Sequence, residues 1–186
     1  MIPIKELVQL NDELAEDLLQ IVQTRETLSK VSVIYKDGSA AQCEMSHVND
    51  LLGKEFTIKC HMNHQHDVWR RLWKQCAVLV NKKISINSIS CFISPAGGQT
   101  PLHYDKNSVL VIQLKGLKNI GIQKLPLNNN PNEDYLVPDQ SLLLDVWHQM
   151  KKGQLVYIPA GYVHATNTEA LSLTLGVGFS ILGCSA

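Results

Sequence analysis

Short apolar runs separated by turn-forming stretches fill the second half of the chain and restrict the fold more than any other feature. From Ile84 onward, β-branched and aromatic residues recur in runs such as ISINSISCFIS, SVLVIQLKG and GQLVYIP. Stretches rich in Pro, Gly and Asn lie between them, including Pro95 to Gly98. Several short strands at this spacing are typical of a β-sandwich or barrel. The sequence therefore predicts a mainly β fold from residue 84 to the end.

The first part of the chain has a different pattern, with two amphipathic helices and short strands. Apolar residues recur every three or four positions between Ile4 and Val22, which predicts a helix there, and the run DVWRRLWKQCAVL predicts a second. Between them, VSVIY and AAQCE predict two strands around an Asp37-Gly38 turn, and FTIKC predicts another. We expect residues 1–83 to form an extension that packs on a barrel of residues 84–186.

Size and charge limit the partners that such a chain can have. Its 186 residues fit one compact unit, and 17 Lys and Arg balance 17 Asp and Glu. Binding to nucleic acid or to an anionic membrane through bulk charge is therefore not expected. Acidic residues interrupt the N-terminal segment, and glycines interrupt the apolar tract Ala170 to Ala186, so neither an export signal nor a membrane span is predicted. Five scattered cysteines suit free thiols in a reducing cytoplasm.

Two motifs in the second half contain candidate metal ligands. His103 and Asp105 stand two apart in an extended stretch, so their side chains project from the same face. Such a pair is common on surface loops and is weak evidence alone. The second motif is GQLVYIPAGYVHATN, which places Gly153, Pro159 and His164 in a strand, turn and strand arrangement.

These motifs resemble those of the cupin superfamily. The second cupin motif reads Gly, five residues, Pro, one, Gly, two, His, and the segment from Gly153 to His164 matches every spacing. The first motif is matched in part, because Gly97, His103 and Asp105 fit it but its later Glu has no counterpart. The resemblance implies a double-stranded β-helix. Two imidazoles and one carboxylate would leave three positions open on a metal, as in non-haem Fe(II) oxygenases.

Within that superfamily, the string TPLHYDKNSVLVIQLKGLK resembles the JmjC-type oxygenases, particularly the asparaginyl and ribosomal-protein hydroxylase branch. The resemblance implies Fe(II) as cofactor and 2-oxoglutarate as cosubstrate, with His103, Asp105 and His164 as metal ligands and catalytic residues. It also implies that Lys118 binds the distal carboxylate of 2-oxoglutarate and that Thr100 assists. On the last strand, Gly176 or Gly178 stands where that branch has an Asn, and an inward-facing Thr174 could replace it. The other interpretation of Lys118 is a solvated residue at a strand end.

Other functions are compatible with the same residues. A cupin that binds metal without 2-oxoglutarate, as another dioxygenase, an isomerase or a small-molecule binding module, is the main alternative. The cluster Cys60 to His66 could bind zinc but has no matching Cys or His pair, so a His-rich loop is the simpler interpretation. A nucleophilic cysteine is not expected, because no Cys has a suitable context. We expect a cytoplasmic enzyme that acts on a peptide, a free amino acid or a small metabolite. A homodimer is a further prediction, because the first helix can pack on a second subunit.

Overall fold

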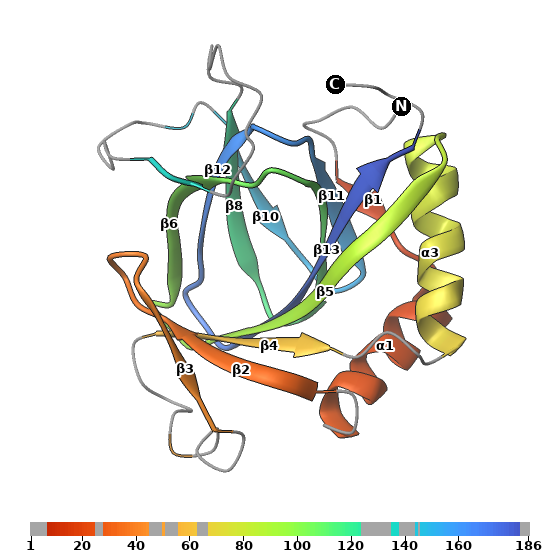
Figure 1. The fold of residues 1–186 in the computed structure, drawn as a ribbon. Coiled ribbons are helices and arrows are strands. Elements are labelled where there is room, and N and C mark those ends of the chain that lie inside the picture. Colours follow the sequence, from red (N-terminus) through yellow and green to blue (C-terminus); the bar gives the residue numbers. More distant parts are fainter. Residues whose placement is uncertain are drawn as a thin grey trace.

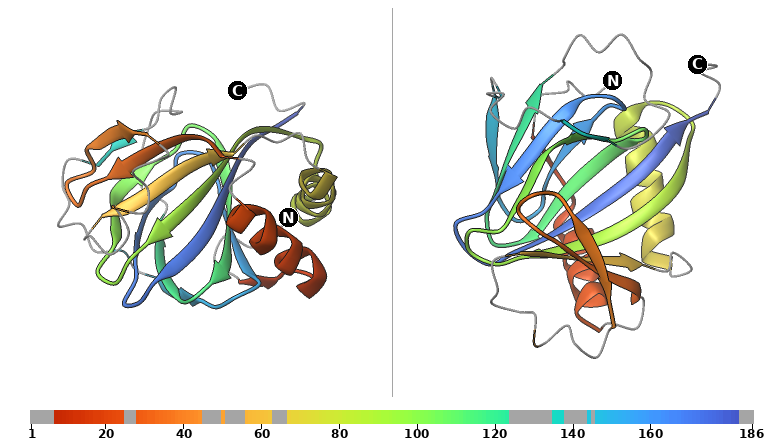
Figure 2. Two further views of the ribbon diagram at one scale, coloured as in Figure 1. Left: turned by 90° about the horizontal axis from the view of Figure 1, so that it is seen from below. Right: turned by 60° about the vertical axis from the view of Figure 1, so that its left-hand side comes forward.

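In its described residues, the protein is a barrel of two facing antiparallel sheets with helices α1 and α3 on its outside (Figures 1 and 2). The structure, a computed structural model, describes residues 7–24, 28–44, 50, 56–62, 67–123, 135–137, 144 and 146–182. The predicted mainly β architecture is confirmed in this part of the chain. Its helices are α1 (Asp12–Thr24) and α3 (Asp67–Val80), both in the first half of the sequence as expected.

The larger sheet has eight strands in the order β1-β11-β7-β13-β5-β4-β2-β3. Their bounds are Val8–Gln9 (β1), Leu28–Ile34 (β2), Ala40–Cys43 (β3), Thr57–Met62 (β4), Ile84–Ser94 (β5), Ser108–Lys115 (β7), Gln154–Ile158 (β11) and Ser172–Ile181 (β13). The predicted hairpin and the FTIKC strand are confirmed as β2, β3 and β4. These three strands extend the same sheet that contains β5, β7, β11 and β13. The division of the chain into residues 1–83 and 84–186 stays a prediction.

The smaller sheet has five strands in the order β10-β8-β12-β6-β9. Their bounds are Gln99–Tyr104 (β6), Lys118–Gln123 (β8), Tyr135–Leu136 (β9), Trp147–Met150 (β10) and Val163–Asn167 (β12). The apolar run QSLLLDVW, residues 140–147, lies mostly outside the described residues, and β10 begins at its last residue. This sheet is important for function because the two histidine motifs lie on its neighbouring strands β6 and β12.

The central strands of the larger sheet are apolar on both faces. Along β7, Leu110, Ile112 and Leu114 pack with the helices, whereas Val111 packs with strands of the smaller sheet. On the helix side, Leu14 and Leu18 of α1 and Leu72 of α3 are almost completely buried. The helices therefore cover the outer face of the larger sheet, and its inner face is free to form the wall of a cavity.

The first helix begins later than its apolar periodicity predicts. Val8–Gln9 pairs with Leu155 and Gln154 at the edge of the larger sheet, so this segment is a strand. Asn11 then ends the extended stretch, because its side-chain Oδ1 accepts a hydrogen bond from the Leu14 amide at 3.2 Å, as a helix N-cap does. The predicted start at Ile4 was wrong over residues 7–11, and residues 4–6 lie outside the described part.

Two glycines lie in left-handed turns, and replacing each by alanine tests how closely other atoms approach them. Gly116 has φ of +74°, and a Cβ there would lie 2.1 Å from the Leu171 carbonyl oxygen. Gly97 has φ of +75°, but no atom lies within 4 Å of the position of its Cβ. We expect Gly97→Ala to lower the free energy of unfolding by about 1–2 kcal/mol through backbone strain alone. Gly116→Ala should lower the free energy of unfolding by about 1–3 kcal/mol more than Gly97→Ala does, because the backbone at Leu171 must move to make room for the Cβ.

Urea denaturation of both variants measures the difference. Equal losses of unfolding free energy in Gly97→Ala and Gly116→Ala would contradict the close approach of the Leu171 carbonyl.

Candidate active site

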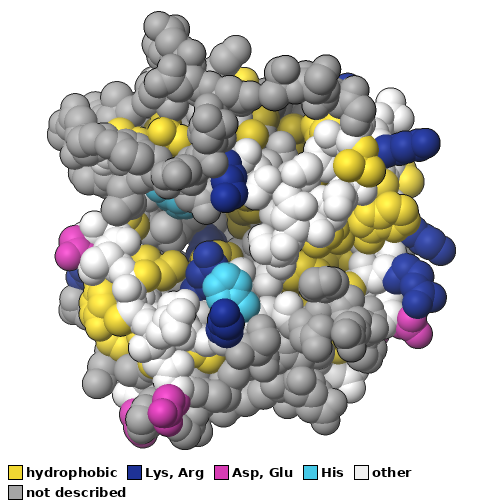
Figure 3. Space-filling model, in the orientation of Figure 1, with side chains coloured by type: hydrophobic (Ala, Val, Ile, Leu, Met, Phe, Trp, Pro, Cys, Tyr) yellow, Lys and Arg dark blue, Asp and Glu magenta, His cyan; other side chains and the backbone are white. Residues whose placement is uncertain are grey.

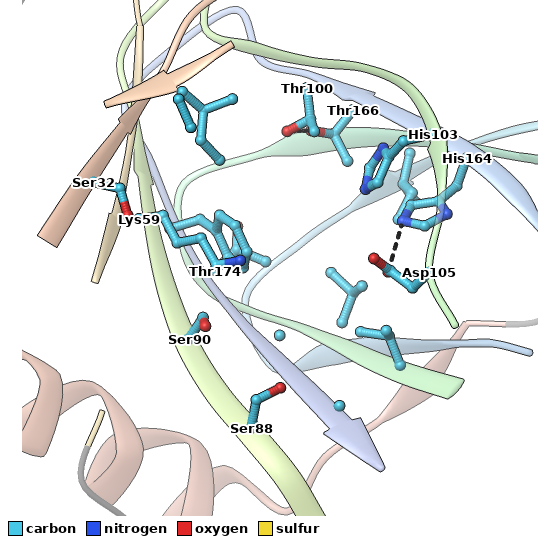
Figure 4. Close-up of a pocket in the computed structure, with 18 of the residues that line it drawn as sticks. Ser32, Lys59, Ser88, Ser90, Thr100, His103, Asp105, His164, Thr166 and Thr174 are labelled. Atoms are coloured by element: carbon cyan, nitrogen blue, oxygen red, sulfur yellow. Dashed lines mark hydrogen bonds and ion pairs between the residues drawn. The ribbon is translucent and has the colours of Figure 1, made fainter. Parts of the chain in front are cut away.

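Three of the predicted residues converge at one end of the smaller sheet. His103 lies near the end of β6, Asp105 follows that strand directly, and His164 lies on β12. His103 and His164 face each other as register partners of the two strands. One potential ligand atom from each of the three residues lies within 4.8 Å of the others. Figure 4 shows the three side chains pointing toward one another inside the barrel.

Backbone hydrogen bonds fix which nitrogen each histidine presents. Nδ1 of His103 lies 2.9 Å from the Pro101 carbonyl oxygen, and Nδ1 of His164 lies 3.1 Å from the Tyr162 carbonyl oxygen. A carbonyl oxygen can only accept, so each Nδ1 carries the proton and donates it. Each Nε2 is then left with a free lone pair, as in histidines that bind metals.

The charge and lone pairs of His103, Asp105 and His164 favour binding of a cation between them. Nε2 of His164 lies 3.4 Å from Oδ2 of Asp105, so a lone pair faces a carboxylate oxygen. Burial lowers the pKa of His164 well below its ordinary value of 6.5, and the neighbouring His103 lowers it further. A proton is therefore not held between the two groups at neutral pH. A divalent metal bound by both imidazoles and the carboxylate would remove the repulsion, and the donor set fits one.

The three residues lie on the wall of a cavity of about 410 Å³ between the two sheets. Lys118, Thr100 and Thr174 line the same cavity, so the structure brings all the sequence-predicted site residues together. Strands β2 and β4 also contribute to its wall, through Ser32 and Lys59. The site is thus built from both halves of the chain.

Lys118 is a buried cation at the start of β8. Only 3% of the residue is exposed, and its Nζ donates to Oγ of Ser94 at 3.2 Å. Ser94 Oγ in turn lies 3.0 Å from Oγ1 of Thr57, which belongs to β4. Nζ also lies 5.9 Å from the centroid of the Phe92 ring. Within the described ranges no carboxylate forms an ion pair with it. Because the residue is almost completely buried, the interpretation of Lys118 as a solvated residue at a strand end was wrong.

Hydroxyl groups contribute polar contacts to the cavity wall. Thr166 of β12 donates to Oγ1 of Thr100 at 3.0 Å, which joins the two strands of the histidine motifs. Thr174 faces inward and donates to Oε1 of the fully buried Gln113 at 2.9 Å. A Cβ at Gly176 would approach the Phe92 ring to 3.0 Å, so the ring occupies the space above this glycine. Thr174 is therefore the polar residue that the last strand offers to the cavity near Gly176.

Cys60 and His61 do not form part of a common metal site. They are consecutive residues of β4 and project from opposite faces, with Cys60 in the apolar core and His61 on the cavity wall. His64 and His66 lie outside the described residues. Burial raises the pKa of the Cys91 thiol, which also lies in the core, so this thiol is not an activated nucleophile. His148 is half-buried on β10.

The sequence did not point to Lys59, Phe92 or the Ser94–Thr57 pair. A signal was present in β4, where Thr57, Lys59 and His61 alternate with Ile58, Cys60 and Met62. An apolar face on one side and polar residues on the other predict that the polar face borders a cavity or solvent. Whether the polar face borders a cavity or solvent depends on the order of strands in the sheet, which alternation alone does not determine.

Comparisons with known proteins agree with this geometry. A family model described as the JmjC domain matches residues 61–184. Mouse ribosomal oxygenase 2 is 27% identical over 169 residues, which cover 84% of this chain and 32% of that protein. The Caenorhabditis elegans bifunctional lysine-specific demethylase and histidyl-hydroxylase NO66 is 27% identical over 121 residues, or 59% of this chain and 16% of that protein. The chain spans about a third or less of these relatives.

Solved structures of Escherichia coli YcfD share the fold. One has a TM-score of 0.68 at 18% identity, and the match covers 94% of this chain and 49% of that one. A second, described as a ribosomal oxygenase in complex with cobalt and 2-oxoglutarate, has a TM-score of 0.63 at 19% identity, covering 88% of this chain and 43% of that one. In the described residues, no helix is both long and apolar enough to cross a membrane. The family match over two thirds of the sequence, and the fold around the paired histidines, show that this chain belongs to the JmjC domain family.

Proposed function

We propose that this protein is an Fe(II)- and 2-oxoglutarate-dependent oxygenase that hydroxylates an unactivated carbon of its substrate. The observation that carries the proposal is the combination of a two-histidine, one-carboxylate site with a buried lysine in the same cavity. A metal bound by three protein ligands keeps positions open for a cosubstrate and oxygen. A buried ammonium without an ion-pair partner in the described residues offers a binding site for a carboxylate.

His103, Asp105 and His164 would hold the metal, each through the atom that it turns toward the other two. With 2-oxoglutarate bound, such a metal would supply the oxidising chemistry, in which one atom of O2 enters the succinate formed with carbon dioxide from 2-oxoglutarate and the other enters a C–H bond of the substrate. The protein itself contributes the positions and orientations of the metal ligands. The hydrogen bonds from Nδ1 of both histidines to backbone carbonyls orient the rings before any ligand binds.

Lys118 would bind the distal carboxylate of 2-oxoglutarate, with Thr100 as a second polar contact. Ser94 positions the ammonium, because its hydroxyl accepts a hydrogen bond from Nζ. The related YcfD was solved with 2-oxoglutarate and also with succinic acid, which fits an enzyme that converts one into the other. A metal cupin that does not use 2-oxoglutarate has no need for a buried lysine at this position.

Binding of 2-oxoglutarate should weaken as the pH rises above about 8. Burial lowers the pKa of the Lys118 ammonium from 10.5 to about 8. Below that pH the group is charged and can bind a carboxylate, whereas above it the neutral amine cannot. We expect the dissociation constant to rise by up to about tenfold per pH unit between pH 8 and 10. Calorimetric titration of the Mn(II)-loaded protein with 2-oxoglutarate measures this.

Lys118→Arg is the control for the pH titration, because a guanidinium stays charged throughout this range. Its affinity for 2-oxoglutarate should vary much less with pH. If the affinity for 2-oxoglutarate fell equally with rising pH in the parent and Lys118→Arg proteins, the pH dependence would belong to another group.

We propose a peptide, a free amino acid or a small metabolite as the substrate. Relatives named ribosomal oxygenases favour a protein or peptide segment. The test is incubation of the Fe(II)-loaded protein with 2-oxoglutarate and pools of peptides and amino acids, followed by a search for products heavier by one oxygen atom. Succinate formed together with such a product supports the oxygenase. Metal binding without succinate in any pool would favour the alternative metal cupin. The cytoplasmic location and the homodimer stay predictions.

A further inference from the structure

Basic side chains gather at the rim of the active-site cavity, on strands β2 and β4. Lys59 and His61 of β4 line the cavity, and Lys30 of β2 is the register partner of His61. Burial lowers the pKa of His61, and the nearby charges of Lys59 and Lys30 lower it further. Figure 3 shows Lys, Arg and His side chains beside a hollow in the middle of one face, with Asp and Glu side chains toward the edges of that view.

Lys59 is the member of this group that reaches into the cavity. The residue is half-buried, and its Nζ lies 5.7 Å from the centroid of the Phe92 ring. Figure 4 shows its side chain extending from β4 toward the interior of the barrel. No carboxylate in the described part of the chain forms an ion pair with it. Asp105 is the one acidic residue among the described residues that line the cavity.

Among the described residues, the charge balance of the cavity leaves Lys59 without a counter-ion. This step rests on the proposed function. A divalent metal, the Asp105 carboxylate, the Lys118 ammonium and doubly charged 2-oxoglutarate together sum to zero. The Lys59 ammonium then remains as an uncompensated positive charge in a partly desolvated cavity. The Phe92 ring offsets only part of the loss of hydration, because a cation–π contact is weaker than an ion pair.

We propose that Lys59 binds a carboxylate of the substrate, so that this enzyme acts on molecules with an acidic group close to the reacting carbon. The acidic group belongs to an Asp or Glu side chain of a peptide or to a small organic acid. Lys118 is almost completely buried beside Ser94 and would bind 2-oxoglutarate. Lys59 is half-exposed at the rim of the cavity, where a substrate would enter. Lys30 adds positive potential that attracts an anion to the same side.

Retention of peptides on the protein, without turnover, tests this role. Immobilised protein loaded with Mn(II) and 2-oxoglutarate and kept free of oxygen is exposed to a pool of short peptides with randomised positions, and retained peptides are sequenced by mass. We expect the parent to enrich Asp- and Glu-containing peptides about three- to tenfold over their Asn and Gln counterparts. Lys59→Gln should lose this preference, and Lys59→Glu should reverse it toward Lys and Arg.

Lys82→Glu is the matched control, because it makes the same charge change at an exposed residue that does not line the cavity. The α-amides of N-acetylglutamate and N-acetylglutamine differ only in the side-chain carboxylate and, added as competitors, distinguish a small acid from a peptide as the source of the carboxylate. Retention of acidic peptides, or binding of the N-acetylglutamate α-amide alone, supports the role of Lys59. Equal retention of acidic and neutral ligands, or equal shifts in Lys59→Glu and Lys82→Glu, would overturn it.

Binding of 2-oxoglutarate to the same preparation separates the two proposals. Normal 2-oxoglutarate binding without a preference for acids rejects only the role of Lys59. Failure of the Mn(II)-loaded parent to bind 2-oxoglutarate rejects the oxygenase itself.

Discussion

Replacing His103, Asp105 or His164 by alanine should abolish tight binding of Fe(II) or Mn(II) while the fold is retained. Loss of a residue that only orients a metal ligand already weakens binding by about ten- to a hundredfold, so loss of a ligand should exceed a hundredfold. The effect should be largest for Asp105→Ala, because it also removes the negative charge that faces His164. Metal content after dialysis against a chelator, together with circular dichroism, measures both parts of the expectation.

His61→Ala is the matched control for the metal-site variants. His61 lines the same cavity but is not among the three residues whose ligand atoms converge. Its replacement should leave metal affinity nearly unchanged. Metal content in His164→Ala equal to that of the parent would show that the three residues are not the ligands.

Lys118→Ala should raise the 2-oxoglutarate concentration for half-maximal turnover by roughly ten- to a hundredfold. A charge-assisted hydrogen bond contributes about 1.5–3 kcal/mol, which corresponds to that range. Without the ammonium, the carboxylate would lose its hydration on entering the barrel and gain no fixed positive partner. Metal affinity should hardly change, because Lys118 is not a ligand. Succinate formation across a 2-oxoglutarate titration measures the shift.

Lys115→Ala provides the control in this titration. Lys115 ends β7 and is exposed, so its ammonium does not reach the cavity. An unchanged half-saturation in Lys118→Ala, or an equal change in both variants, would remove Lys118 from the cosubstrate site.

The sequence predicted the part of the site that lies within short motifs. His103 and Asp105 are close in the chain and share a face of an extended segment, and the spacing from Gly153 to His164 fixes a turn between two strands. Lys118 was placed by its distance from His103 within one local pattern. In each case the signal lies within one short stretch of the sequence.

The contributions of the first half of the chain could not be predicted in the same way. Lys59 and His61 reach the cavity only because β4 pairs with β5, and strand order is not encoded in alternation. The start of α1 was missed for a related reason. Leu7 and Leu10 fit a helical period, but the pairing of Val8–Gln9 with β11 and the Asn11 cap outweighed that period.

The central claim is that metal and 2-oxoglutarate bind together between His103, Asp105, His164 and Lys118. The most direct test is anaerobic addition of 2-oxoglutarate to the Fe(II)-loaded protein, because chelation of Fe(II) by a 2-oxo acid gives a visible charge-transfer absorption and needs no substrate. We expect this band in the parent, a shift of its 2-oxoglutarate dependence to higher concentration in Lys118→Ala, and no band in His164→Ala. A parent protein that binds Fe(II) but shows no band at saturating 2-oxoglutarate would contradict the claim.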